Sequence, residues 1–321
     1  MLRAVLIGLG NIAWKFSHDN NTGSSLCHKD AFLKNKKVSL LAGYAPNDAH
    51  VKNFSMNTGV IGFTNINQML EEIKPDIVSI CSPQEFHAEH VTLCLENKVP
   101  MIWLEKPAAG SADEIKKLEN IRSTMKTPST ILVNFQRRYS ENYQKLKALI
   151  EKEIYGAPLL IEINYSQGLQ LNGSHMLDIL IYLFPNFDYE LLWADNKNKP
   201  NNPSFIYRLS NNLIVNVSGI ESDFHNIDIR VVFEKARISI EHCDMSIRLE
   251  KVSNNKFFPG FRLLKDSNAD EIGSPGFNYS FDMALEDLIE SNNKKYQPQS
   301  NLLTAFKGQE LVEKVLNRLT K

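Results

Sequence analysis

The chain has 321 residues, more than one ordinary domain of roughly 100 to 200 residues, so two domains are expected. Hydrophobic residues make up 43% and charged residues 23%, which is typical of a globular protein, and the formal net charge is -1. Such a charge provides no field that would attract nucleic acid or a membrane surface, so the partner we expect is a small molecule.

The first apolar run, Ala4 to Ile7, is broken at once by Gly8 and Gly10. It is too short for a signal-peptide core or a bilayer span. The four cysteines are scattered and form no Cys-x-x-Cys pair, so we expect buried, reduced thiols in a cytoplasmic protein. They are Cys27, Cys81, Cys94 and Cys243.

The first 135 residues alternate short apolar runs with amphipathic stretches, the pattern of βαβ units in a parallel sheet. Helical spacing covers Asn67 to Ile73 and Ala88 to Asn97, and Ser111 with Glu114 predicts a capped helix start. Strands are predicted near Leu2 to Gly8, Val38 to Gly43, Asp76 to Cys81, Pro100 to Leu104 and Thr130 to Phe135. Residues 1–135 therefore read as a Rossmann-type, nucleotide-binding domain with a doubly wound parallel sheet.

From Gly156 the strand signals become closely spaced, so residues 136–321 are predicted to form an α+β domain with one large, mostly antiparallel sheet. Its predicted strands are Leu159 to Tyr165, Ser204 to Leu209, Leu213 to Gly219, Ile227 to Phe233, Arg237 to Glu241 and Met245 to Lys251. Its predicted helices are Ser174 to Phe184, Ser280 to Ser291 and Leu302 to Leu319. Residues 195–203 are predicted to be a solvated hairpin or turn, and Ser253 to Gly276 a loop.

A glycine motif, Gly8-Leu9-Gly10-Asn11-Ile12-Ala13, follows the first strand and matches Gly-x-Gly-x-x-Gly/Ala. The first glycine permits a tight turn, the second lets the backbone approach a pyrophosphate, and the small last residue allows close helix packing. A helix starting there would offer its free N–H groups to the phosphates. The motif predicts a dinucleotide site that includes Asn11 and Ile12.

Ala45 stands where an acidic residue usually binds the adenosine ribose, so the sequence leaves NAD and NADP both open as the cofactor. The segment Phe16 to Asp30 is an insertion after the glycine turn. It either covers the nucleotide or is a surface loop, and we expect the surface loop.

Two further loops are expected at the carboxyl-end edge of the sheet, Ser82-Pro83 followed by His87, and Glu105-Lys106-Pro107. His87 and His90, with Glu85 and Glu89, could imitate a metal cluster. We expect no metal, because a helix starting after Pro83 explains these polar residues as its first turns.

Together these motifs resemble the glucose-fructose oxidoreductase and inositol dehydrogenase family. The glycine turn, Ser82-Pro83 with His87, and Glu105-Lys106-Pro107-Ala108 carry the resemblance. Further matches are Asn134 to Tyr139, Gly156, and Gly173 to Asp178. The resemblance implies a dinucleotide-binding domain, sugars, polyols or sugar nucleotides as substrates, and a second domain whose open sheet forms a homodimer or homotetramer face.

Lys106 is the predicted catalytic group beside the hydride-transfer site. Hydride transfer at a carbinol carbon leaves charge on the substrate oxygen, and an ammonium held against that oxygen stabilises it or relays its proton. Burial would lower the pKa of this lysine toward working pH. The alternative is a surface lysine paired with Glu105. The cofactor-binding residues expected around it are Gly8, Gly10, Asn11, Ile12, Ser82, Pro83, His87, Glu105 and Lys106 itself.

His175 lies at the start of a predicted helix with Asp178 one turn later. The resemblance implies that this histidine handles the proton and that the aspartate contacts substrate hydroxyls. Family members of the inositol dehydrogenase type carry an aspartate where this chain has Leu171, so Asn172 is at most a hydrogen-bonding partner. We therefore expect a Lys106 and His175 pair, in a member that serves surface-sugar or sugar-nucleotide biosynthesis.

Further candidates for substrate contacts are Arg137, Arg138, Tyr165 and Gln167. The two arginines either bind a substrate phosphate or carboxylate or form structural ion pairs. Trp103 is expected in the core.

The sequence therefore predicts an NAD(P)-dependent oxidoreductase that acts on a hydroxyl or keto group of a sugar or sugar nucleotide. Two alternatives stay open, a reductase of a non-sugar cyclic substrate and a nucleotide-binding regulator without turnover. Ala45 and Leu171 are the departures that keep the regulator possible, whereas Lys106 and His175 argue against it.

Overall fold

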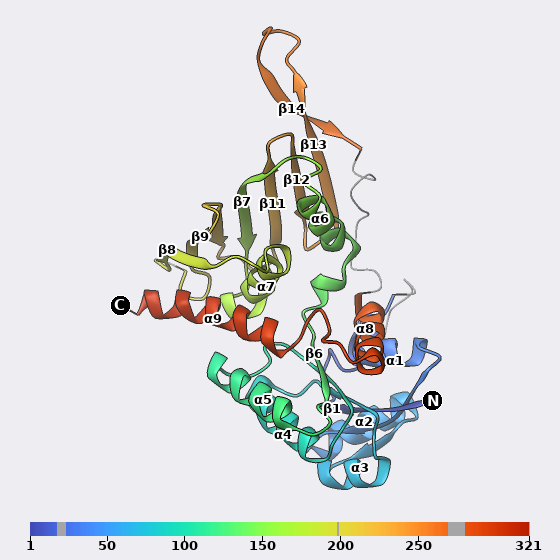
Figure 1. The fold of residues 1–321 in the computed structure, drawn as a ribbon. Coiled ribbons are helices and arrows are strands. Elements are labelled where there is room, and N and C mark those ends of the chain that lie inside the picture. The colour runs from blue at the N-terminus through green and yellow to red at the C-terminus, as the bar shows by residue number, and fades with distance from the viewer. Residues whose placement is uncertain (18–23, 198, 269–279, 321) are drawn as a thin grey trace. The chain divides into compact units, whose positions relative to one another are not determined.

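The computed structural model describes residues 1–17, 24–197, 199–268 and 280–320. The chain divides into two compact units, Met1–Tyr139 with Asn278–Lys307, and Ser140–Phe277 with Gly308–Lys321. Unit 1 is built on a six-stranded sheet and unit 2 on an eight-stranded sheet (Figure 1). The predicted fold class, a Rossmann-type sheet followed by an α+β domain, is confirmed.

The sheet of unit 1 is parallel throughout, in the order β3-β2-β1-β4-β5-β6. Its strands are β1 (Leu2–Ile7), β2 (Val38–Tyr44), β3 (Ile61–Phe63), β4 (Ile77–Ile80), β5 (Met101–Leu104) and β6 (Thr130–Val133). Five of the six were predicted, because strands covered on both faces read as continuous apolar runs. The short edge strand β3 gave no comparable run and was not predicted.

Alternating side chains of this sheet enter two separate cores. Met101 and Trp103 pack with α1 (His28–Lys34) and α8 (Ser280–Lys294). Ile102 and Leu104 enter the other core, which α3, α4, α5 and the first residues of α9 cover. The helices not yet bounded are α2 (Asp48–Thr58), α3 (Ile66–Ile73), α4 (His87–Glu96), α5 (Ala112–Thr124) and α9 (Leu302–Leu319). This alternation decides which face each residue beyond a strand end can reach.

The predicted capped start of α5 is confirmed. Ser111 Oγ accepts the Glu114 N–H at 3.2 Å, and the Glu114 carboxylate accepts the Gly110 N–H at 2.9 Å. The Glu114 carboxylate therefore bonds to the backbone of Gly110, the residue before the cap, rather than to the backbone of Ser111, the cap itself.

The sheet of unit 2 has the order β14-β13-β12-β11-β7-β10-β9-β8, and only the β7–β10 pair is parallel among the described strands. The strands are β7 (Pro158–Tyr165), β8 (Tyr189–Asp195), β9 (Ser204–Leu209), β10 (Ile214–Gly219), β11 (Ile227–Phe233), β12 (Ala236–Glu241), β13 (Ser246–Asn254) and β14 (Arg262–Ser267). The loop predicted for Ser253 to Gly276 is therefore wrong where β13 ends and where β14 runs, while residues 269–279 lie outside the described ones. β14 is an edge strand without alternating burial, so its sequence carries no strand pattern.

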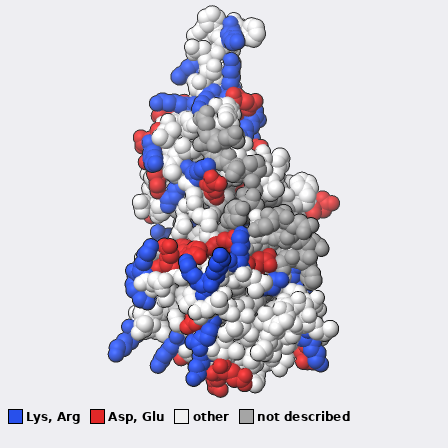
Figure 2. Space-filling model, turned by 90° about the vertical axis from the view of Figure 1, so that its right-hand side faces the viewer, with Lys and Arg blue, Asp and Glu red and all other residues white. Residues whose placement is uncertain are grey.

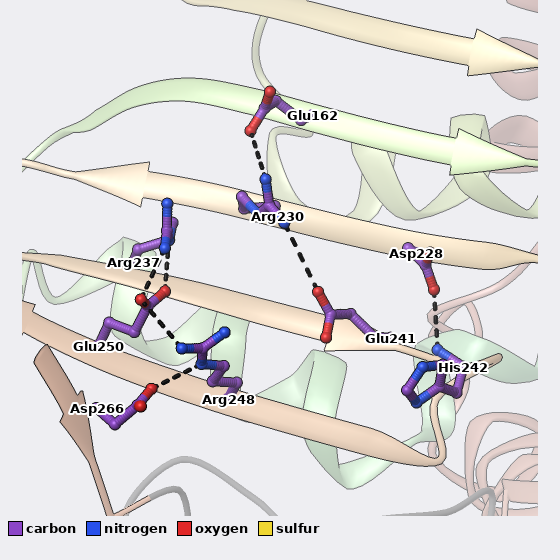
Figure 3. Close-up of polar contacts among 9 residues, drawn as sticks. All are labelled: Glu162, Asp228, Arg230, Arg237, Glu241, His242, Arg248, Glu250 and Asp266. Atoms are coloured by element: carbon purple, nitrogen blue, oxygen red, sulfur yellow. Dashed lines mark hydrogen bonds and ion pairs between the residues drawn. The ribbon is translucent and has the colours of Figure 1, made fainter. Parts of the chain in front are cut away.

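One face of this second sheet is apolar and the other is charged. The apolar face packs against α6 (Glu141–Glu151), α7 (Ser174–Leu183) and the later residues of α9. On the other face Arg230 pairs with Glu162 at 3.4 Å and with Glu241 at 3.8 Å (Figure 3). The row continues with Arg237 to Glu250 and Arg248 to Asp266 in the same view.

The predicted turn at residues 195–203 connects β8 to β9, which pair antiparallel. It is a hairpin connection, as expected, but it is not solvated throughout. Asn202 is buried, donates to Glu221 Oε2 at 2.9 Å and accepts the Gly168 N–H at 2.7 Å. A polar sequence here serves an internal hydrogen-bond network.

Basic and acidic side chains lie beside one another on the face drawn in Figure 2. Among the described residues, no helix is both long and apolar enough to cross a bilayer. The four cysteines form no disulfide bond among the described residues, and Cys243 is partly exposed, so the expectation that all four are buried is wrong for that residue.

Candidate functional site

The glycine turn begins at Gly8, directly after β1. Gly8 has φ +88°, and a Cβ built there would lie 2.6 Å from Ser82 N and 2.7 Å from Cys81 O. Only glycine fits, because the ends of β1 and β4 meet without room for a side chain. At Gly10 a Cβ would meet no protein atom within 4 Å, so open space lies beside this backbone.

The helix expected directly after the glycines does not start there. Residues 11–14 form turns and Lys15–Ser17 a short 3-10 helix, whereas α1 begins only at His28. The N–H groups of His28 and Lys29 nevertheless bond to the carbonyls of Ile12 and Ala13, at 3.1 and 2.9 Å. The insertion therefore separates α1 from the glycine turn in the sequence, but these two hydrogen bonds attach the start of α1 to the end of that turn.

The surface loop expected for Phe16 to Asp30 is also wrong for its last residues. Ser25, Cys27 and His28 are buried, the latter two completely. Residues 18–23 lie outside the described ones. The insertion therefore returns into the core of unit 1 before α1 begins.

The second loop follows β4 and leads into α4 through a 3-10 turn, Gln84–Phe86. His87 is buried, with Nδ1 at 2.7 Å from Pro107 O and Nε2 at 2.8 Å from Ser82 O. It ties this loop to the Glu105-Lys106-Pro107 loop. His90 turns instead to Ser82 Oγ, at 2.9 Å. Within the described part of the chain, no three His, Cys, Asp or Glu side chains gather as metal ligands would.

Glu105 follows β5 and points into the α1 side of the sheet, where it is almost completely buried. Its Oε1 accepts hydrogen bonds from His28 Nε2 at 2.8 Å and from Asn134 Nδ2 at 2.5 Å. Burial alone would raise the pKa of this carboxyl, but the bonds from His28 and Asn134 and the charge of Lys106 outweigh it. The pKa of Glu105 therefore lies below its ordinary value, and the carboxylate is ionised.

Lys106 is the next residue, and its side chain is partly exposed. Burial lowers the pKa of its ammonium below the ordinary value, the Glu105 carboxylate counteracts this, and Arg137 lowers it further. The Lys106–Pro107 peptide bond is cis. The group that the sequence singled out thus combines a partly desolvated ammonium with a fixed carboxylate beside it.

The two arginines after β6 lie in a 3-10 turn, Gln136–Tyr139, and both are buried. Arg138 donates to Gln299 O at 2.7 Å, which favours a structural role for it. Trp103 is completely buried, as expected, and its Nε1 donates to Asn134 Oδ1 at 3.1 Å.

Ala45 is buried at the end of β2, and its N–H bonds to Phe63 O. No carboxylate stands at this position. The cofactor type therefore remains open between NAD and NADP.

In unit 2, His175 and Asp178 lie in the first turns of α7 and are both buried. Their helix continues a π-helical turn, Leu169–Gly173, that runs directly into it. Ser174 Oγ donates back to Gln170 O at 2.8 Å, a bond made within a helix rather than at its start.

Asn172 and Leu171 take opposite environments. Asn172 is buried with its amide 3.2 Å from His225 Nδ1, whereas Leu171 is 48% exposed. Tyr165 is completely buried and its hydroxyl donates to Pro203 O at 2.7 Å, so it presents no group to a substrate. Gln167 likewise donates to Ser222 O. We therefore leave Tyr165 and Gln167 out of the substrate site.

Sequence reasoning missed His28, Ser79 and Asn134 as partners around Glu105. Asn134 stood only within a longer matched segment. The available signals were a serine inside the apolar run of β4 and a histidine at the end of the insertion. Neither signal says which residue lies opposite.

Comparison with known proteins adds independent information. Residues 2–132 match the model of the oxidoreductase family with an NAD-binding Rossmann fold. Myo-inositol 2-dehydrogenase of Thermotoga maritima is 26% identical over 125 residues, which are 37% of this chain and 36% of that protein. The chain thus matches about a third of the length of this curated relative.

Solved structures resemble nearly the whole chain. Scyllo-inositol dehydrogenase of Lactobacillus casei has a TM-score of 0.76 at 14% identity, covering 100% of this chain and 96% of that one. A 3-ketoreductase of Actinomadura kijaniata, in complex with TDP-benzene and NADP, has a TM-score of 0.77 at 12% identity and covers 99% and 98%. At these identities the likeness concerns the fold. The family match, to the glucose-fructose oxidoreductase and inositol dehydrogenase model, thus covers residues 2–132, and beyond them the likeness to known proteins is one of fold.

Proposed function

We propose that this chain is an NAD(P)-dependent oxidoreductase that moves hydride between the nicotinamide and a hydroxyl or keto carbon of a sugar-like substrate. The observation that carries the proposal is Lys106, whose pKa is lowered chiefly by burial and which follows β5 at the sheet edge where the glycine turn follows β1. Ligands of parallel sheets bind outside this edge. An ammonium there stabilises the alkoxide that forms as hydride leaves, or relays its proton.

The residues of the glycine turn fit a dinucleotide. The open space beside Gly10 leaves its backbone accessible to a pyrophosphate, while Asn11 and Pro83 are exposed around it. The nicotinamide of the bound cofactor would supply or accept the hydride. His87 and Glu105 are buried, so their part in our proposal is to shape the two loops rather than to touch the cofactor.

Residues 1–135 are proposed to bind the nucleotide and residues 136–321 the substrate. His175 would exchange a proton with the substrate, and Asp178 and Asn172 would contact its hydroxyls. Arg137 would face a phosphate or carboxylate of the substrate. The 3-ketoreductase neighbour was solved with TDP-benzene, which supports a sugar nucleotide as the finer substrate class. Cysteines without disulfide bonds among the described residues agree with a cytoplasmic location.

The first test is cofactor binding, which is measured by nicotinamide fluorescence as NADH or NADPH is titrated into the protein. If the protein binds neither NADH nor NADPH, the proposal is wrong. A panel of polyols, sugars and sugar nucleotides is then scanned at 340 nm with wild type, Lys106→Ala and the matched control Lys117→Ala, which removes an exposed lysine of α5. Turnover that Lys106→Ala loses and Lys117→Ala keeps supports the proposal. Cofactor binding without any turnover would favour a nucleotide-binding regulator instead.

We also propose that copies of the chain associate as a homodimer or homotetramer through the charged face of the second sheet. Arg230, Glu162 and Glu241 lie on that face with 43%, 40% and 30% of their side-chain surface exposed, and side chains of both signs make it self-complementary (Figure 3). Light scattering should give a multiple of the 36.6 kDa chain mass, and Arg230→Glu should lower it. A monomer in wild type would contradict this assembly.

A further inference from the structure

A buried hydrogen-bond network lies behind Glu105, and the proposed function makes no use of it. Ser79 on β4, Glu105 after β5 and Asn134 after β6 come from three adjacent strands. Each continues the strand face that carries Ile77, Trp103 or Leu132 into the α1 core, so all three side chains point to the same side. His28, the first residue of α1, is completely buried among them.

The donor that faces Glu105 Oε1 follows from the chemistry of the two groups. An ionised carboxylate only accepts, so His28 Nε2 carries the proton that it donates to Glu105 at 2.8 Å. Nδ1 of the same ring lies 2.6 Å from Ser79 Oγ, a second hydrogen bond that orients the imidazole. His28 also packs on Trp103, with ring centroids 4.1 Å apart, which fixes the plane of the imidazole.

Asn134 is oriented by the same logic. Trp103 Nε1 can only donate, so the atom of Asn134 that faces it at 3.1 Å is the oxygen. The amide nitrogen of Asn134 must then face Glu105 as a second donor. Contacts with Trp103 therefore hold both His28 and Asn134, and both residues donate to Glu105 Oε1.

The order Ser79, His28, Glu105 has the hydrogen-bond pattern of a nucleophile, base and acid. That function does not fit, because Ser79 and His28 have no exposed surface and a substrate could not reach the hydroxyl. What the network can reach is Lys106. The other oxygen of Glu105, Oε2, accepts the backbone N–H of Lys106 at 3.3 Å, and its charge acts on the Lys106 ammonium.

We propose that His28 is a positioning residue, which keeps Glu105 ionised and in place and thereby sets the pH range in which Lys106 changes its charge. This inference rests on the proposed function, in which Lys106 holds or moves a proton. The other charged or titratable groups that act on this pair are Arg137, in the turn after β6, and Cys81, after β4.

The direction of the effect follows from the charges. Without the His28 donor, the buried carboxyl loses part of what offsets its burial and takes up a proton more readily. A neutral Glu105 no longer supports the Lys106 ammonium, so burial and Arg137 then lower the pKa of Lys106 further. Lys106 should therefore lose its proton at lower pH, by about one to three units, the usual effect of removing a neighbouring opposite charge.

The experiment reads Lys106 directly. The protein is labelled with [ε-13C]lysine, the Lys106 signal is assigned by its absence in Lys106→Arg, and its shift is followed with pH in the absence of substrate. His28→Leu should lower the midpoint by one to three units. His28→Gln, whose amide nitrogen can replace the Nε2 donor, should restore most of it.

Two further variants keep the test decisive. Asn134→Leu removes the other donor and should lower the midpoint as well, which covers the case in which His28→Leu fails to fold. His90→Leu removes a buried histidine of the same unit that bonds to Ser82 instead, and it should leave the midpoint unchanged. An unchanged midpoint in folded His28→Leu, or an equal shift in His90→Leu, would overturn the inference. Failure of the proposed function would appear separately, as absence of turnover in a wild type whose Lys106 still titrates as described.

Discussion

Nε2 of His28 lies 2.8 Å from Oε1 of Glu105, although 77 residues separate the two in the chain. The contact joins the end of the insertion to the residue that precedes Lys106. The insertion therefore ends in a buried contact that orders the Glu105 carboxylate, and substitutions near residue 28 should alter the position of this carboxylate.

The two glycines of the turn should respond differently to alanine. Gly8→Ala places a Cβ 2.6 Å from Ser82 N at φ +88°, so it should lower the free energy of unfolding by about 1 to 3 kcal/mol. Gly10→Ala meets no protein atom, so it should leave stability within about 0.5 kcal/mol while weakening NADH and NADPH binding. Urea denaturation and nicotinamide fluorescence measure the two quantities. Unimpaired cofactor binding in Gly10→Ala would mean that the pyrophosphate does not approach this backbone.

Lys106→Ala should reduce kcat by about 10²- to 10⁴-fold, the usual contribution of a positioned acid or base. Because burial lowers the pKa of Lys106, the limb of the pH–rate profile that belongs to it should lie below 10.5, the ordinary lysine value. Stopped-flow hydride transfer from pH 6 to 10.5 shows the limb, and Lys106→Arg should remove it because arginine keeps its proton. A limb that persists in Lys106→Arg belongs to another group.

His87 should stabilise the loops after β4 and β5 together, since its ring nitrogens face Ser82 O and Pro107 O. His87→Phe replaces the imidazole by another aromatic ring but leaves two partly buried carbonyls without this partner, so it should cost about 1 to 3 kcal/mol. Hydrogen exchange should show faster opening of both loops, not only of the loop that carries the substitution. The exposed His50→Phe on α2 serves as the control and should change neither.

How far the sequence predicts this protein differs between its parts. β9, β11 and α9 have the bounds that their patterns predict, because each alternates or repeats one buried face. β8 and β14 were missed, because neither strand has a fully buried residue and β8 contains a bulge between Leu191 and Trp193. A sequence pattern therefore predicts a helix or strand only where at least one face of that element is buried.

The candidate site divides in the same way. The loops at Gly8, Ser82 and Glu105 could be placed together from the sequence, because parallel strands bring their carboxyl ends to one edge. The partners of Glu105 could not, since His28 lies beyond an insertion and bonds residues 51 and 77 positions away. Which buried polar groups meet is decided by packing across three strands and a helix, and no local pattern records that.

The ionisation of Glu105 predicts how stability depends on acid. Its pKa is lower in the folded protein than the ordinary 4.5 of an unfolded chain, despite burial, because of His28, Asn134 and Lys106. Between these two values the unfolded state binds more protons, so the stabilisation is complete above about pH 4.5 and is lost as pH falls through the folded pKa.

Glu105→Gln cannot titrate, so its deficit in unfolding free energy relative to wild type should be largest at pH 6 to 7 and shrink toward pH 3. The shrinkage should be about 1.4 kcal/mol for each unit by which the folded pKa is lowered. Arg237 lowers the pKa of the Glu250 carboxyl, and Arg3 lowers the pKa of the Asp76 carboxyl despite its burial. Both carboxyls titrate in wild type and in the variant, so their contributions cancel in the difference. Urea denaturation at a series of pH values gives the two curves. A deficit that stays constant or grows toward acid would show that Glu105 is not held ionised in the folded state, and the role given to His28 would lose its basis.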